Sequence, residues 1–329
     1  MKAGAFAVLT LAFAALAAAS LCSGSGGLSC ADVLSALFLQ SSDETANLVV
    51  WQIRLPRLAA AVLSGASLAL AGAGMQSLFR NPLADPSITG VSSGAALGAV
   101  LAVSFFPSAF GVEIGALAVG LAAAVAVCAV GHSGSKMSAV STLLAGIAVN
   151  AFCGALVGFF MYSVRDAGMR GFVFWSLGSL ERCGWEELGV SFALCVPAWI
   201  AMLCAARPLN VMLLGEENAF DCGVDVSRAR FAVIAAAAVM TAASVSICGI
   251  IGFVGLVVPH VLRMVVGTDN RLLMPLSALG GATLLVLADV VSRAFSQTDP
   301  VPIGVITALM GAPFFAALLR SKGVSNARY

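Results

Sequence analysis

The sequence predicts an all-α polytopic membrane protein, and three observations support this fold class. Of the 329 residues, 60% are hydrophobic and 10% are charged, and the mean hydropathy is +1.02, whereas about a quarter of the residues in a soluble domain are charged. Many of the 34 glycines lie inside apolar runs, where small residues let membrane helices approach closely. The alternating segments of a membrane β-barrel are not seen, and the apolar content suffices for about ten helical spans of ~20 residues.

Charge excludes several classes of function. The chain carries 17 basic and 16 acidic residues, a net charge of +1, so it has no long-range field that would attract a nucleic acid. Together with the high hydropathy, this balance excludes a soluble enzyme and a nucleic-acid-binding protein.

The first apolar run covers residues 4–22, behind Lys2. Ala17, Ala18 and Ala19 offer a signal-peptide cleavage site, but an uncleaved first helix is favoured in a chain that goes on to span many times. Nine further spans are expected, which gives ten in all: 57–79, 88–106, 113–131, 139–162, 186–206, 230–249, 250–267, 272–295 and 303–320. Three glycine pairs inside these runs keep a small-xxx-small spacing: Gly94/Gly98, Gly111/Gly115 and Gly154/Gly158.

Two connections between the spans are long. The segment 163–185, which contains Phe172 to Trp175, suggests a short surface helix. The segment 207–229 is the most charged part of the chain, and it predicts a short amphipathic helix that opens at Gly215 with two acidic residues and ends at Gly223. That helix is either a solvated loop helix or one that fits a cleft in a cytosolic partner.

The lysines and arginines of the loops set the expected orientation. With the N-terminus inside, eleven of them are cytoplasmic: Lys2, Arg80, Lys136, Arg207, Arg228, Arg230, Arg263, Arg271, Arg320, Lys322 and Arg328. Six lie outside: Arg54, Arg57, Arg165, Arg170, Arg182 and Arg293. Both termini are therefore expected in the cytoplasm.

We find no sequence motif for catalysis. The three lysines, Lys2, Lys136 and Lys322, do not follow a glycine, so the Gly-Lys-Ser/Thr of a P-loop is missing, and no ATP hydrolysis is expected from this chain. Ion coupling would require an ionisable residue near the bilayer midplane. Asp289 is instead expected to pair with Arg293 four residues later, and His260 to be a packing residue.

Cysteines and metal ligands give little indication of function. The nine cysteines form no CxxC motif and no Cys/His zinc spacing, so no metal site is predicted. Cys22, Cys30 and Cys183 could lie outside the membrane, which leaves room for one disulfide.

Three arginines mark the outer face. Arg54 and Arg57 flank Pro56 at the outer mouth of the second span, and Arg293 lies at the outer end of the ninth. Such residues commonly anchor a helix in the headgroup region; three together also suggest a docking surface for carboxylates.

Several motifs in order resemble the FecCD-type permeases, the membrane subunits of ABC importers for ferric siderophores, haem and cobalamin. The resemblance covers residues 50–321, and its motifs are Arg54–Arg57, Gly72–Pro86, Gly215–Glu217 with Gly223–Val224, Gly252–His260 followed by Arg263, Leu287–Asp289, Pro302–Val305 and Gly311–Pro313.

This resemblance implies a single permease domain over 1–329 with ten helices in the type II ABC importer fold. It also implies a dimer with a second copy or a paralogue, two cytosolic ATPase subunits that use ATP and Mg, and a periplasmic or lipid-anchored substrate-binding protein. The chain itself would hold no cofactor.

The resemblance also implies roles for individual residues, which fall into four groups. Those matched to binding-protein docking are Arg54, Arg57 and Arg293. Those matched to coupling with the ATPase are Gly215, Glu216, Glu217, Asn218, Ala219, Gly223 and Val224. Those matched to the cytoplasmic gate are Asn81, Leu83, Ala139 and Val140. Those expected to line the pathway are Asn150, Phe152, Phe159 and Phe160.

The sequence thus predicts the permease subunit of an ATP-driven importer in the bacterial inner membrane. The expected cargo is a metal chelate, namely a ferric siderophore or haem, with cobalamin as the alternative. An ion-coupled secondary transporter or a channel is the alternative from a different class.

Overall fold

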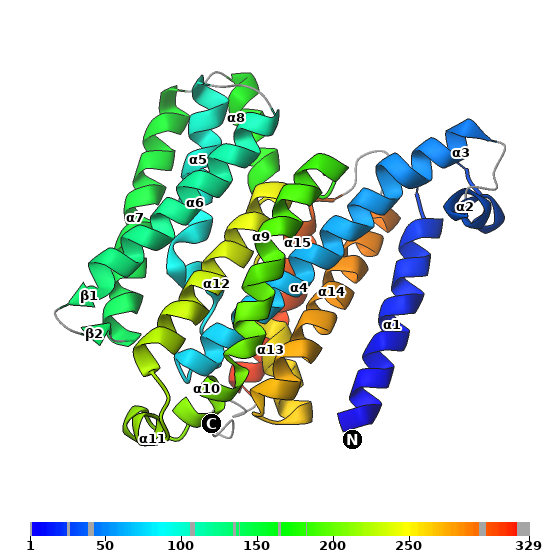
Figure 1. Ribbon diagram of the computed structural model, residues 1–329. Coiled ribbons are helices and arrows are strands. Elements are labelled where there is room, and N and C mark those ends of the chain that lie inside the picture. The colour runs from blue at the N-terminus through cyan, green and yellow to red at the C-terminus, as the bar shows by residue number, and fades with distance from the viewer. Residues whose placement is uncertain are drawn as a thin grey trace.

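A computed structural model describes residues 2–24, 27–38, 43–105, 109–133, 136–137, 139–163, 166–181, 183–295 and 301–320. Within these ranges the chain is a bundle of helices that run between two ends (Figure 1). Four residues of the orientation argument lie outside the described residues: Arg165, Arg182, Lys322 and Arg328.

The elements follow one another along the chain with one short hairpin among the helices. The helices of the first half are α1 (Lys2–Cys22), α2 (Cys30–Leu37), α3 (Glu44–Leu48), the π-helical η1 (Val49–Arg54), α4 (Leu55–Leu78), the 3₁₀ turn η2 (Pro86–Thr89), α5 (Val91–Phe105) and α6 (Ala109–Gly131). Strands β1 (His132–Ser133) and β2 (Lys136–Met137) pair antiparallel. The remaining helices are α7 (Ala139–Ser163), α8 (Asp166–Ser176), α9 (Trp185–Cys204), α10 (Ala206–Met212), α11 (Glu216–Asp221), α12 (Val226–Cys248), α13 (Val254–Val266), α14 (Asn270–Phe295) and α15 (Ile303–Arg320).

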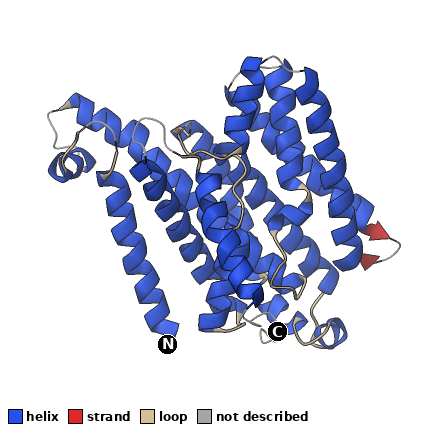
Figure 2. Ribbon diagram, turned by 180° about the vertical axis from the view of Figure 1, so that it is seen from behind, coloured by secondary structure: helices blue, strands red, loops and turns tan. Residues whose placement is uncertain are grey.

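Ten apolar helices in the described residues correspond to the ten predicted spans. In the described part of the chain, seven helices are long and apolar enough to span a membrane, and the three shorter apolar helices α5, α13 and α15 bring the number to ten. The start of α1 and the last turn of α15 lie at the end of the bundle that carries α11, and α2, α3 and α8 lie at the opposite end (Figures 1 and 2). We call these the α11 end and the α8 end.

Helix α4 passes through the middle of the bundle. It packs against α9, α12, α13 and α14, and small residues make these contacts possible. A Cβ atom placed at Gly65 would lie 2.3 Å from the Gly281 carbonyl oxygen of α14, and one at Gly72 would lie 1.8 Å from the Gly255 carbonyl oxygen of α13. Larger side chains would therefore force the helices apart.

Helices α5, α6 and α7 form a second group beside this centre. The predicted small-residue spacing applies to α5 and α6, because a Cβ at Gly98 would lie 1.9 Å from the Gly115 carbonyl oxygen. It does not produce contacts within the chain at Gly154 and Gly158 of α7, where the space around an added Cβ is open.

The second span begins earlier than predicted. Residues Glu44–Leu78 form one continuous apolar helix through α3, η1 and α4, rather than a helix that starts at 57. Pro56 does not break it, because the preceding turn is π-helical and Leu55 donates to the Val50 carbonyl, five residues back. A proline is tolerated where its missing N–H is not needed.

The predicted span 250–267 begins later than expected. Its helix, α13, starts only at Val254, after a non-helical stretch in which Gly249 and Phe253 have positive φ angles of 70° and 68°. The side chain of Gln76 on α4 donates to the carbonyls of Gly255 (3.3 Å) and Leu256 (3.0 Å). The stretch is covered only in part, because Gly249 and Ile251 are buried whereas Gly252 is exposed.

The surface helix predicted within 163–185 is confirmed as α8. Helices α2 and α3 were not predicted, although the sequence carries a signal for α2. Ser29 and Asp32 form a capping box at its start, and their hydrogen bond lowers the pKa of the Asp32 carboxyl group.

Candidate functional site

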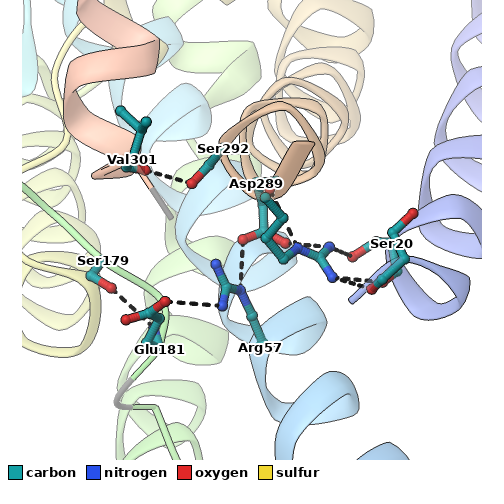
Figure 3. Close-up of polar contacts among 9 residues, drawn as sticks. Ser20, Arg57, Ser179, Glu181, Asp289, Ser292 and Val301 are labelled. Carbon is teal, nitrogen blue, oxygen red and sulfur yellow. Dashed lines mark hydrogen bonds and ion pairs between the residues drawn. The ribbon is translucent and has the colours of Figure 1, made fainter. Parts of the chain in front are cut away.

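At the α8 end, two of the three predicted docking arginines, Arg57 and Arg293, bind one buried carboxylate, and Arg54 lies near Arg293. Asp289 of α14 is buried, and its oxygens lie 2.7 Å from Arg57 Nε of α4 and 2.7 Å from an Arg293 nitrogen one turn along α14. The pair Asp289–Arg293 was predicted from the spacing; the contact with Arg57 was not. We call Arg57, Asp289, Arg293 and Arg54 the arginine cluster; Figure 3 shows Arg57 beside Asp289.

The arginine cluster also holds the end of α1. Arg293 donates to the carbonyls of Ser20 (3.0 Å) and Ser23 (2.6 Å) and to the Ser20 hydroxyl (2.7 Å), and Arg54 donates to the Leu21 carbonyl (2.6 Å). These carbonyls at a helix C-terminus have no partner within the helix. Arg54 and Arg293 are therefore buried and bonded within the chain.

Arg57 has a second, looser carboxylate partner. Glu181, between α8 and α9, lies 3.6 Å from Arg57 Nη1, and its side chain is 47% exposed against 1% for Asp289. Neither Glu181 nor the contact between α4 and α14 was predicted, because both require knowing which segments meet. The docking role of the three arginines remains a prediction.

At the α11 end, the predicted amphipathic helix is present as α11, between Gly215 and Gly223. Gly215 has φ 124° and Gly223 φ 80°, conformations that a glycine adopts at little cost. Ala219 is buried, while Leu214 and Phe220 are 71% and 75% exposed. The helix thus presents apolar and acidic side chains on an exposed surface.

Two connections fix α11 and α10 to the membrane helices. Glu216 forms an ion pair with Arg230 of α12, and Val224 N–H donates to the Ala219 carbonyl, which closes the end of α11. Asn210 of α10 donates to Asp269 (2.7 Å) and accepts from the backbone N–H of Asn270 (2.9 Å), at the start of α14. Helices α11 and α10 are therefore bonded directly to α12 and to the start of α14, respectively.

A buried polar network continues from Asn270 into the bundle. Its side-chain oxygen accepts from Ser77 of α4 (2.7 Å), and Arg263 of α13 donates to Ser77 (3.4 Å). The Gln76 carbonyl accepts from the backbone N–H of Asn81 (3.1 Å). This network joins the segment that carries α10 to one of the predicted gate residues. Sequence reasoning missed it, although Gln76, a glutamine within an apolar run, is a usable signal.

The predicted gate residues lie in two places. Asn81 and Leu83 belong to the turn after α4, where the Asn81 side chain accepts from the Leu83 N–H (2.9 Å). Ala139 and Val140 begin α7. Their role in closing a pathway remains a prediction.

The residues predicted to line the pathway differ in exposure along α7. Phe152 and Phe159 are 66% and 65% exposed. Phe160 is partly buried and contacts Phe105 edge-on. Asn150 accepts from the Ser93 hydroxyl of α5 (2.6 Å), so its side chain faces α5 rather than the exposed face. The lining role remains a prediction for all four.

Cysteines form no disulfide in the described part of the chain. Cys22 and Cys30 are neighbours at the connection between α1 and α2, and both are free thiols. Cys183 is buried, and burial raises the pKa of its thiol, which makes it a poor nucleophile.

Comparisons with known proteins agree with this architecture. The model of the FecCD transport family matches residues 11–321. The chain is 46% identical over 283 residues to the cobalamin import system permease protein BtuC of Halobacterium salinarum, covering 85% of this chain and 76% of the relative. It is 42% identical over 277 residues to the hemin transport system permease protein HmuU of Yersinia pestis, covering 82% and 83%.

A solved structure has the same fold over nearly the whole chain. It is an inward-facing conformation of a metal-chelate type ABC transporter, with a TM-score of 0.87, 34% identity, and coverage of 98% of this chain and 100% of that one. Its agreement supports the predicted type II permease fold. The chain is a transmembrane ABC permease of the FecCD transport family.

Proposed function

We propose that the chain is the permease subunit of an ATP-driven importer for a metal chelate, with a cobalt corrinoid or haem as the cargo. The observation that carries the cargo class is the similarity, above 40% identity, to permeases named for cobalamin and for hemin. A ferric siderophore, expected alongside haem from the sequence, is the further member of this class. The exposed face of α7 suits bulky cargo, because apolar walls without charges offer no deep binding well.

ATP hydrolysis belongs to two partner subunits in this proposal. The exposed apolar side chains of Leu214 and Phe220 make α11 similar to a helix that fits a groove in a partner protein. The ion pair of Glu216 with Arg230, and the hydrogen bonds of Asn210, would pass its movement to α12 and α14. The α11 end would then be cytoplasmic, with both termini on that side.

A substrate-binding protein would dock at the α8 end. The arginine cluster supplies three guanidinium groups on this end, and guanidinium groups bind carboxylates strongly. Arg54 and Arg293 donate to carbonyls at the end of α1. Arg57 is also bound to Asp289, but its other partner is the loosely held, half-exposed Glu181, so Arg57 is the arginine we expect to meet the incoming carboxylate first.

Uptake measurements test the cargo. In a strain that lacks the gene, accumulation of labelled cobalamin, haem and a ferric siderophore is compared with accumulation in the same strain complemented by the gene. Loss of cobalamin or haem uptake alone, restored by the gene, is the expected result. Loss of the siderophore alone would correct the cargo, and normal uptake of all three would contradict the proposal.

A charge reversal tests the coupling role. Glu217→Lys at the exposed surface of α11 should separate ATP hydrolysis from uptake in the complex reconstituted in vesicles, whereas Glu186→Lys at the α8 end, a matched control, should not. Normal coupling in Glu217→Lys would support the alternative interpretation, in which α11 is a solvated loop helix. An ATP-binding subunit that co-purifies in mild detergent would exclude the ion-coupled alternative.

A further inference from the structure

Asp289 and Glu181 bind the same arginine in different ways. Asp289 is buried, lies 2.7 Å from Arg57 and is shared with Arg293. Glu181 is half exposed and lies 3.6 Å from Arg57 on the side away from Asp289 (Figure 3). The first contact is part of the packed structure, whereas the second can open without exposing a buried charge.

We infer that Glu181 is a displaceable carboxylate, which occupies Arg57 until an acidic side chain of the substrate-binding protein replaces it. This inference rests on the docking role proposed above and adds to it a residue that competes with the partner. Asp289 then acts as the positioning residue, since it keeps the guanidinium of Arg57 in place during the exchange.

The charges of the cluster favour the exchange. Arg54 and Arg57 both lie close enough to Arg293 to act on it electrostatically. Of the two carboxylates, Asp289 contacts Arg57 and Arg293, and Glu181 contacts Arg57. The cluster therefore has one positive charge in excess, and it has two when Glu181 moves away. An exposed ion pair such as that of Glu181 is weak and easily exchanged, so an incoming carboxylate meets a net positive site.

The segment that carries Glu181 is bonded to two helices of the bundle. The Ser179 N–H donates to the carbonyl of Cys248 (2.9 Å) at the end of α12, and its hydroxyl accepts from the Glu181 N–H (3.2 Å). At the start of α15, the N–H groups of Ile303 and Gly304 donate to the carbonyls of Gly178 (3.0 Å) and Leu177 (3.1 Å). Release of Glu181 therefore acts on a segment in direct contact with α12 and α15. Docking at Arg57 can change the hydrogen bonds of this segment to both helices.

The test measures the affinity of the binding protein encoded with the permease, fluorescently labelled, for the assembled permease in nanodiscs. Glu181→Gln removes the competing charge and keeps the shape, so it should lower Kd by about two- to five-fold, the range of an exposed ion pair. Glu186→Gln, the matched control, removes one charge from the same end at an exposed residue of α9 and should change Kd less. Glu181→Asp keeps the charge and should remain closer to the unmodified protein.

The effect of Glu181→Gln should vanish in an Arg57→Gln background, because there is no guanidinium left to compete for. Asp289 keeps Arg293 as a partner in that background, so the variant is expected to fold. Equal Kd changes in Glu181→Gln and Glu186→Gln, or weaker binding in Glu181→Gln, would overturn the inference while leaving docking at Arg57 intact. An unchanged Kd in Arg57→Gln alone would instead reject the docking role itself.

A second measurement uses the unmodified protein. If docking releases Glu181, the backbone amides of Ser179 and Gly304 should exchange hydrogen faster in the presence of the binding protein. Unchanged or slower exchange at both amides would contradict the release of Glu181 on docking.

Discussion

Helices α4 and α7 have nearly the same length, 24 and 25 residues, and both are apolar enough to span a membrane. In the structure, however, 83% of an 18-residue apolar window in the helix that contains α4 is buried inside the chain, against 17% of such a window in α7. Hydropathy therefore indicates that a helix leaves water, but not what covers it. The two helices differ in what surrounds them. Other helices of this chain surround α4, whereas most of the surface of α7 is left to contact lipid, cargo or another chain.

Small and polar side chains explain the difference. Along α4, Gly65 and Gly72 admit the backbones of α14 and α13, and Arg57 and Gln76 bond to groups on those same helices. The free face of α7 presents Phe152 and Phe159 beside Gly154 and Gly158, which meet nothing in the chain. Three variants test this contrast, and for each one the stability of the purified permease subunit is compared with that of the unmodified protein.

Loss of the central carboxylate should have the largest effect. Asp289→Ala leaves Arg57 and Arg293 buried without their shared partner, and breaking a buried ion pair in this way costs about 3–5 kcal/mol. We expect a large drop in the thermal unfolding midpoint in detergent, with loosening of α1, whose end Arg293 holds. A stability close to that of the unmodified protein would show that the cluster serves docking alone.

A larger residue at a helix crossing should have the next largest effect. Gly65→Leu places a side chain where Gly281 of α14 already lies and should destabilise by about 3 kcal/mol, toward the upper range of overpacking. The matched control, Gly158→Leu, adds the same side chain on α7, where the space is open, and should leave the subunit stable. Comparable losses in both variants would refute the contrast between α4 and α7.

The smallest effect is expected at an exposed aromatic residue. Phe152→Ala should change the unfolding free energy of the isolated subunit by no more than about 0.5 kcal/mol, as for most surface substitutions, because Phe152 is 66% exposed. If Phe152 lines the pathway, uptake should change nonetheless in the assembled importer. A loss of several kcal/mol, typical of a buried phenylalanine, would mean that this face of α7 is covered within the chain.

The sequence by itself determined the class of the protein, the number of spans and the short helix at 216–221. These features depend on local composition: apolar runs long enough to cross a bilayer, and glycines at the ends of an acidic turn. The pair Asp289–Arg293 could also be predicted from the sequence, because residues four apart lie on one side of a helix. The starts of the second and eighth spans were harder to predict from the sequence. Tertiary contacts allow a π-turn before Pro56 and a non-helical stretch before Val254.

Only the tertiary structure decided which residues meet. Arg57 is 232 positions from Asp289, and Ser77 is 193 positions from Asn270, so no local pattern could join them. The structure likewise decided that Asn150 faces α5 while Phe152 is exposed, and that Glu181 reaches Arg57. The physical reason is that pairing and burial depend on how helices are placed in three dimensions, whereas a one-dimensional pattern fixes only the faces that each helix can offer.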